Sequence, residues 1–217
     1  MKRPDANPPS GIDEKFGDLG RFQSLRRFWL AAGLAALAVL LLFVGSAWNS
    51  APVSEGIEYA GLFLIGLGIL GRLWCTLYIG GKKAGMVVST GPYSIMRNPL
   101  YFFSAIAALG AGAQSGSIVV ALALGLLCVA AFHIVIAREE RFLAEKFGAP
   151  YLAYLNAVPR FFPSPRLFQD DAVVSVIPKR VYATLLDGLV FFAAVPAFAL
   201  VEHLQISGVL PVLLRLY

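Results

Sequence analysis

The most constraining feature of this chain is a series of apolar runs that approach the length of a membrane-spanning helix. A hydrocarbon core of about 30 Å needs about 20 apolar residues in a helix. One run is shorter, because the stretch that starts at Pro99 fades after about 16 residues, or about 24 Å of helix. We therefore expect an all-α, polytopic membrane protein with about five transmembrane helices. The runs begin near residues 28, 57, 99, 118 and 181.

The composition supports a membrane location. Hydrophobic residues make up 58% of the 217 and charged residues 14%, whereas a soluble domain carries about 25% charged residues. The length suits one domain. We expect residues 1–27, which are polar and contain Pro4, Pro8 and Pro9, to form a largely disordered tail. Residues 28–217 should then form a single helical membrane domain.

The distribution of basic residues predicts an orientation in the membrane. Nearly all Lys and Arg lie in the N-terminal tail and in residues 80–98 and 138–180. The links around Pro52 and Ser115 contain none. Because cytoplasmic segments carry the excess of Lys and Arg, the N-terminus and both long polar segments should face the cytoplasm. The basic residues form no stripe interleaved with aromatic residues, which argues against nucleic acid as a partner. No obligate protein partner is evident.

The two cysteines do not suggest a metal or redox site. Cys75 and Cys128 lie singly inside apolar runs, with no C-x-x-C motif and no nearby histidine pair. Such cysteines usually act as small hydrophobic side chains. We therefore predict no bound metal.

Two charged residues fall inside predicted spans, where charge is usually functional. Arg72 either extends its guanidinium toward the interface or reaches into a site from the side, and the sequence does not choose. Arg72 and Lys179 are both candidates to pair with Asp187.

The first long polar segment contains a turn followed by the start of a helix. Gly-Pro at residues 91–92 marks the turn. Asn98 suits the N-cap of a helix and Pro99 its first position. The start of a helix explains these residues, but it does not explain Arg97 or the flanking Tyr93 and Tyr101.

The second long polar segment predicts two helices. The span that begins near residue 118 should continue past the membrane to Phe147, where Gly148 caps it and Pro150 prevents continuation. A short helix over residues 151–158 should follow.

An acidic pair, Glu139 and Glu140, lies near the end of the longer of these helices. One interpretation is a solvated helix face on which the two carboxylates pair with Arg138 and Arg141. The other is a functional site, because this segment and the first polar segment fall on the same side of the membrane.

Together, the two segments resemble the isoprenylcysteine carboxyl methyltransferase family, which is similar to membrane phospholipid N-methyltransferases. The order is Gly-Pro-Tyr, Arg-x-Pro-x-Tyr, a hydrophobic hairpin, Glu-Glu-x-x-Leu-x-x-x-Phe-Gly-x-x-Tyr-x-x-Tyr and Arg-Phe-Phe-Pro. The resemblance covers residues 89–163. It implies a multi-span helical fold, S-adenosylmethionine as the methyl donor and a cofactor pocket at the cytoplasmic ends of the helices.

The resemblance also implies roles for individual residues. Asn98 departs from the pattern, because the family usually has His at this position, and Asn cannot take up a proton near neutral pH. A role as a base at that position is therefore in doubt. The implied catalytic residues are Arg97, Glu139 and Glu140, and the implied cofactor-binding residues are Tyr93, Asn98, Pro99, Tyr101, Gly148, Tyr151 and Tyr154.

Methyl transfer from a sulfonium is a single in-line displacement, so it depends on positioning and electrostatics. We expect Arg97 to grip a carboxylate and the two glutamates to bind ribose hydroxyls or an ammonium. The expected acceptor is a lipophilic small molecule, a prenylated compound or a membrane lipid. The alternatives are a phosphatidylethanolamine N-methyltransferase, a membrane reductase that uses NADPH, and a bundle that only binds a partner or lipid.

Overall fold

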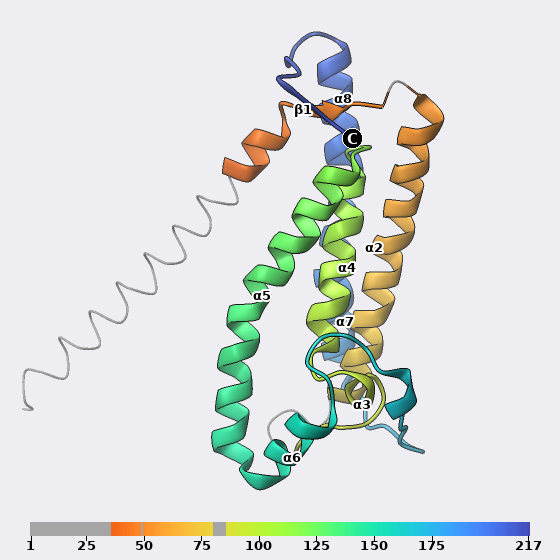
Figure 1. Cartoon of the computed structure of the whole chain (residues 1–217). Coiled ribbons are helices and arrows are strands. Elements are labelled where there is room, and N and C mark those ends of the chain that lie inside the picture. The colour runs from red at the N-terminus through yellow and green to blue at the C-terminus, as the bar shows by residue number, and fades with distance from the viewer. Residues whose placement is uncertain (1–35, 49, 80–85) are drawn as a thin grey trace, which may run out of the picture. The chain divides into compact units, whose positions relative to one another are not determined.

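The computed structural model describes residues 36–48, 50–79 and 86–217. The chain divides into two units, residues 1–44 and 45–217. In the first unit, residues 36–41 are helical. The second unit is mostly helical (Figure 1). Its helices are α2 (Ala51–Ile79), α3 (Pro92–Ile95), α4 (Pro99–Ala113), α5 (Ile118–Phe147), α6 (Ala149–Ala157), α7 (Pro178–Leu189) and α8 (Ala194–Ile206), with 3-10 turns η1 (Pro165–Leu167) and η2 (Val190–Ala193).

The all-α membrane fold is confirmed. Three helical segments are long and apolar enough to cross a membrane: Ala51–Ile79, Ile118–Phe147 and Pro178–Ile206. A shorter apolar helix, Pro99–Ala113, accompanies them. The protein is thus an integral membrane protein. The predicted span at residues 28–48 and the predicted N-terminal tail lie largely outside the described residues, so five spans and a single domain from residue 28 stay predictions.

Small residues bring α2 and α4 close together. A Cβ atom added at Gly68 of α2 would lie 2.7 Å from the Cβ of Ala107 and from the carbonyl oxygen of Phe103, both in α4. Gly61 of α2 meets α4 equally closely near Gly110. Such small-residue contacts let helix backbones approach in a membrane. Helix α4 packs against both α2 and α5 (Figure 1) and therefore lies between them in the bundle.

Helix α5 is longer than the hydrocarbon core requires. Ser117 caps its start by accepting a hydrogen bond from the Val120 backbone N–H at 3.3 Å. Its 30 residues span about 45 Å, against a core of about 30 Å. Gly148, at φ 60°, ends it as predicted. The short helix α6 begins at Ala149 rather than residue 151, because Pro150 suits the first turn of a helix as well as a stop.

The C-terminal helical segment begins slightly earlier than residue 181, where the sequence predicts its start. It begins at Pro178 and tightens into η2 just before Pro196; proline lacks the N–H that would continue the α-helical ladder. The last dozen residues do not extend this helix. Gly208, at φ 75°, reverses the chain after α8, and strand β2 (Leu214–Leu216) pairs with β1 (Val44–Ser46).

Candidate active site

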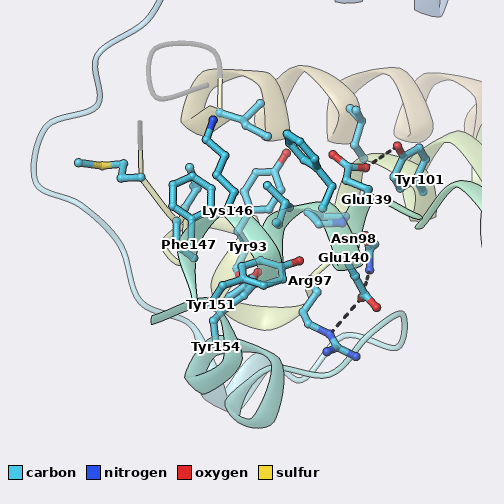
Figure 2. Close-up of a pocket in the computed structure, with 18 residues that line it drawn as sticks. Tyr93, Arg97, Asn98, Tyr101, Glu139, Glu140, Lys146, Phe147, Tyr151 and Tyr154 are labelled. Atoms are coloured by element: carbon cyan, nitrogen blue, oxygen red, sulfur yellow. Dashed lines mark hydrogen bonds and ion pairs between the residues drawn. The ribbon is translucent and has the colours of Figure 1, made fainter. Parts of the chain in front are cut away.

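The two polar segments meet at one end of the bundle and enclose a cavity of about 410 Å³ (Figure 2). Pockets for small molecules typically measure about 300–1,000 Å³. Of the ten residues proposed from the sequence, nine lie in the cavity wall; Gly148 does not, and its position is the end of α5. The wall comprises Ile79, Met86, Val87, Val88, Tyr93, Arg97, Asn98, Pro99, Leu100, Tyr101, Glu139, Glu140, Phe142, Leu143, Lys146, Phe147, Tyr151 and Tyr154.

A glycine turn sets the position of the first segment. Gly91 has φ 59°, and an added Cβ would lie 2.3 Å from the Tyr78 ring. Its N–H donates to the Gln169 carbonyl oxygen at 2.7 Å, and the Gln169 N–H donates to Ser94 Oγ at 3.0 Å. The turn is therefore fixed between α2 and the chain that follows α6, and α3 places Tyr93 in the cavity wall.

Glu140 joins three segments of the chain. Its Oε1 lies 3.6 Å from Arg97 Nε, and its Oε2 lies 3.0 Å from Arg160 Nη2. The Arg97 guanidinium also donates to the Leu155 carbonyl oxygen at 3.1 Å. Glu140 and the Leu155 carbonyl oxygen therefore fix the position of the Arg97 guanidinium without a ligand. Arg160 was not predicted as a site residue, although the closing Arg-Phe-Phe-Pro motif contains it.

Asn98 occupies the N-cap position of α4, as predicted, but its side chain makes no capping hydrogen bond. The buried amide nitrogen instead donates to Glu140 Oε1 at 3.2 Å and to the Arg160 carbonyl oxygen at 3.0 Å. The predicted N-cap position is therefore confirmed, and the side chain is held through its amide nitrogen, for which a carboxylate is a strong acceptor.

Glu139 faces a different environment from Glu140. It is exposed and accepts a hydrogen bond from the Tyr101 hydroxyl at 2.8 Å. Figure 2 shows this pair on the other side of the cavity from Tyr154. Glu140 is bound by arginines of other segments rather than by Arg138 and Arg141 of its own helix. The acidic pair therefore divides into one carboxylate neutralised by arginine and one available to a ligand.

The tyrosines of the cavity provide uncharged hydroxyls. Tyr154 donates its hydroxyl to the Tyr93 carbonyl oxygen at 2.8 Å. The Tyr93 hydroxyl is buried and has no hydrogen-bond partner among the described residues. Burial raises the pKa of Tyr93 well above its usual value, and burial with the nearby Glu140 raises the pKa of Tyr151 to about 12. Both hydroxyls are therefore protonated at neutral pH, and that of Tyr93 can satisfy a ligand.

Lys146 lines the cavity and was not proposed from the sequence. Its Nζ lies 5.4 Å from the centroid of the Phe147 ring and 5.9 Å from that of Phe142. A signal was present, since residues three, four and seven positions apart share a helix face. That spacing places Lys146 on the face of Glu139 and Leu143.

Arg72 lies outside the cavity wall. Its Nη1 donates to Ser104 Oγ of α4, and its buried Nε has no hydrogen-bond partner among the described residues. Within that part of the chain, no ion pair joins Arg72 or Lys179 to Asp187. The polar link to α7 is instead made by Thr76, whose hydroxyl lies 2.9 Å from that of Thr184.

The fold and the cavity define a helical membrane protein with a ligand site at one end of its bundle. Residues 57–150, which supply most of α2, all of α4 and α5 and most of the cavity wall, match the sequence model of the phospholipid methyltransferase family. No solved structure matches the chain.

Two curated proteins are similar over most of their length. The cobalt-zinc-cadmium resistance protein CzcN of Cupriavidus metallidurans is 35% identical over 151 residues, which cover 70% of this chain and 69% of that protein. The nickel-cobalt-cadmium resistance protein NccN of Alcaligenes xylosoxydans xylosoxydans is 30% identical over 205 residues, covering 93% and 92%. The chain belongs to one family with these two proteins, and part of it, residues 57–150, matches the phospholipid methyltransferase model. The narrower resemblance to isoprenylcysteine carboxyl methyltransferases stays a prediction.

Proposed function

We propose that this protein is an S-adenosylmethionine-dependent methyltransferase that acts on a lipophilic acceptor at the cytoplasmic side of the membrane. The observation that supports this most is the single cavity into which both motif segments contribute side chains. The α4–α5 hairpin separates the two segments in the sequence. If each segment only stabilised its own helix end, the two would not need to line the same pocket.

The residues of the cavity fit the proposed cofactor. Glu139 offers an exposed carboxylate for an ammonium or for ribose hydroxyls, and the unpartnered Tyr93 hydroxyl offers a donor and an acceptor. The rings of Phe147 and Tyr151 provide flat apolar surface for a purine. Arg97 would attract the cofactor's carboxylate only with the part of its guanidinium that Glu140 leaves free.

The chemistry needs few protein groups. When bound, S-adenosylmethionine supplies a methyl group on a sulfonium; the methyl–sulfur bond breaks as the bond to the acceptor forms, and S-adenosylhomocysteine leaves. Glu139 and Tyr93 would orient the donor, and the Glu140 cluster would hold the loop that carries Arg97. The apolar part of the wall would exclude water, which strengthens these electrostatic interactions.

A phospholipid amine is the second candidate acceptor, because the matching family is that of phospholipid methyltransferases. It shares the donor site and differs only in the acceptor. A membrane lipid also fits a cavity that lies at the end of the bundle and is walled largely by apolar side chains.

Ligand-dependent thermal stability of the full chain in lipid nanodiscs tests the proposed function. S-adenosylhomocysteine should raise the melting temperature, and NADPH should not. Transfer of labelled methyl from S-adenosylmethionine to extracted membrane lipids should follow. Stabilisation by NADPH alone would instead support the reductase.

A further inference from the structure

The charges of the cavity are not evenly compensated. Arg97 and Arg160 both contact Glu140, at 3.6 and 3.0 Å. Lys146 has aromatic rings beside its ammonium, and no carboxylate of the described residues forms an ion pair with it. Glu139 accepts a hydrogen bond from the Tyr101 hydroxyl. Lys146 is thus the cation of this cavity that the described part of the protein leaves unpaired.

The pairing of these charges favours an anionic acceptor. Among the described residues, the cavity wall carries two cations, Arg97 and Lys146, and two carboxylates, Glu139 and Glu140. Glu140 is engaged by Arg97 and by Arg160, which lies outside the wall, so Lys146 has no carboxylate partner of its own. S-adenosylmethionine, with a sulfonium, an ammonium and a carboxylate, adds another positive charge. These charges, including the exposed Lys146, act on the molecule that enters next. An amine that carries a proton is repelled, and an anion is attracted.

The position of Lys146 matches an amphiphile. Figure 2 shows Lys146 beside Phe147, on the side of the cavity away from the hydrogen-bonded Glu139 and Tyr101. The rings of Phe142 and Phe147 lie beside its ammonium. The apolar wall residues are Ile79, Met86, Val87, Val88, Leu100, Phe142, Leu143 and Phe147.

We propose that Lys146 is the residue that determines acceptor specificity, and that the acceptor is an amphiphile with a net negative charge. Its anionic group pairs with the Lys146 ammonium, and its hydrocarbon part lies against the apolar wall. The inference that the bound anion is the methyl acceptor rests on the proposed function. Binding of an anion at Lys146 can, however, be measured without the cofactor.

The binding experiment compares three lipophiles of one chain length and different charge: oleate, oleyl alcohol and oleylamine. Their affinity for the full chain in phosphatidylcholine nanodiscs is measured without cofactor. The wild type should bind oleate most tightly. Lys146→Gln should weaken oleate binding roughly twofold to fivefold, as expected for a charge pair at an exposed lysine, and should leave oleyl alcohol unchanged. Lys146→Arg should retain the preference, as should Lys179→Gln, which removes an exposed cation outside the cavity.

A second measurement uses membrane lipids separated by charge on an anion exchanger, with labelled S-adenosylmethionine. The anionic fraction should accept the methyl group, and Lys146→Gln should raise KM for that fraction more than it lowers kcat. An equal affinity for the three lipophiles, a preference that survives Lys146→Gln, or labelling confined to the zwitterionic or neutral fractions would overturn the inference. Failure to bind S-adenosylhomocysteine, with the oleate preference intact, would overturn the proposed function and leave the anion site standing.

Discussion

Glu139 and Glu140 are neighbours in the sequence, yet their surroundings predict opposite consequences of mutation. Glu140→Gln removes the charge that compensates Arg97 and Arg160. Leaving two guanidinium groups without it should cost about 1–3 kcal/mol of stability. Glu139→Gln removes a carboxylate that is exposed and accepts a hydrogen bond from the Tyr101 hydroxyl.

Thermal unfolding and S-adenosylhomocysteine affinity separate the two variants. Glu140→Gln should lower both the melting temperature and the affinity. Glu139→Gln should lower the affinity about tenfold, the effect of losing one charged hydrogen bond, and leave the melting temperature within about one degree, because the mutated group is exposed. Equal effects of both variants would contradict the division of the acidic pair.

Two tyrosines offer a second matched pair. Tyr93→Phe removes a buried hydroxyl that has no partner among the described residues, so it should leave stability unchanged or raise it slightly. Tyr154→Phe removes the hydrogen bond to the Tyr93 carbonyl oxygen and should cost about 1 kcal/mol. Only Tyr93→Phe should weaken S-adenosylhomocysteine binding without loss of thermal stability. If Tyr93→Phe binds this ligand like the wild type, its hydroxyl does not face the cofactor.

At the residue scale, the sequence predicted which side chains gather but not how they pair. Arg97 and the acidic pair could be placed together because their segments share one side of the membrane and resemble a known motif set. Consecutive helical residues, however, point about 100° apart, so Glu139 and Glu140 separate once α5 is packed. The position of Arg160 depends on the path of the chain after α6, for which the sequence carries no periodic signal.

At the scale of elements, the contact between α2 and α4 predicts that equal substitutions in one helix have unequal effects. Gly68→Ala places a methyl group 2.7 Å from α4 backbone and side-chain atoms, and overpacking of this kind should cost about 1–3 kcal/mol. Gly66→Ala meets nothing within 4 Å and should be neutral or stabilising by up to about 1 kcal/mol, because alanine favours helix.

Thermal unfolding of these two variants in the same detergent is the measurement. S-adenosylhomocysteine affinity should also fall in Gly68→Ala, because α4 carries Asn98, Pro99 and Tyr101 at its cavity end. Similar melting temperatures for both variants would show that α2 and α4 do not pack as closely as described.

Local chemistry explains which elements were predictable. The end of α5 follows from Gly148, whose positive φ suits glycine, and the start of α4 follows from Pro99. Strand β2 was missed because its partner β1 lies far away in the sequence. Three residues with no alternating pattern carry no strand signal by themselves. The 3-10 turn η2 shows the same limit. Pro196 signals that the α-helix is interrupted near this position, but it does not predict that the interruption is a 3-10 turn.

At the scale of the whole molecule, one helix relates the cavity to the membrane. Helix α2 runs from Ala51 to Ile79, and Ile79 lines the cavity. The distance from Glu55, in its first turns, to Ile79 is about 36 Å along the helix, which exceeds a hydrocarbon core of about 30 Å. Glu55 and the cavity must therefore lie on opposite sides of the bilayer if α2 spans it.

The distribution of Lys and Arg predicts that the cavity side is cytoplasmic, and cysteine labelling tests this. In a background with Cys75 and Cys128 replaced by alanine, Glu55→Cys and Arg166→Cys each introduce one exposed thiol, at the two ends of the bundle. A membrane-impermeant maleimide should label Glu55→Cys in intact cells and Arg166→Cys only after permeabilisation. The reverse pattern would place the cavity outside the cytoplasm. S-adenosylmethionine made in the cytoplasm would not reach it there, and the proposed function would lose its methyl donor.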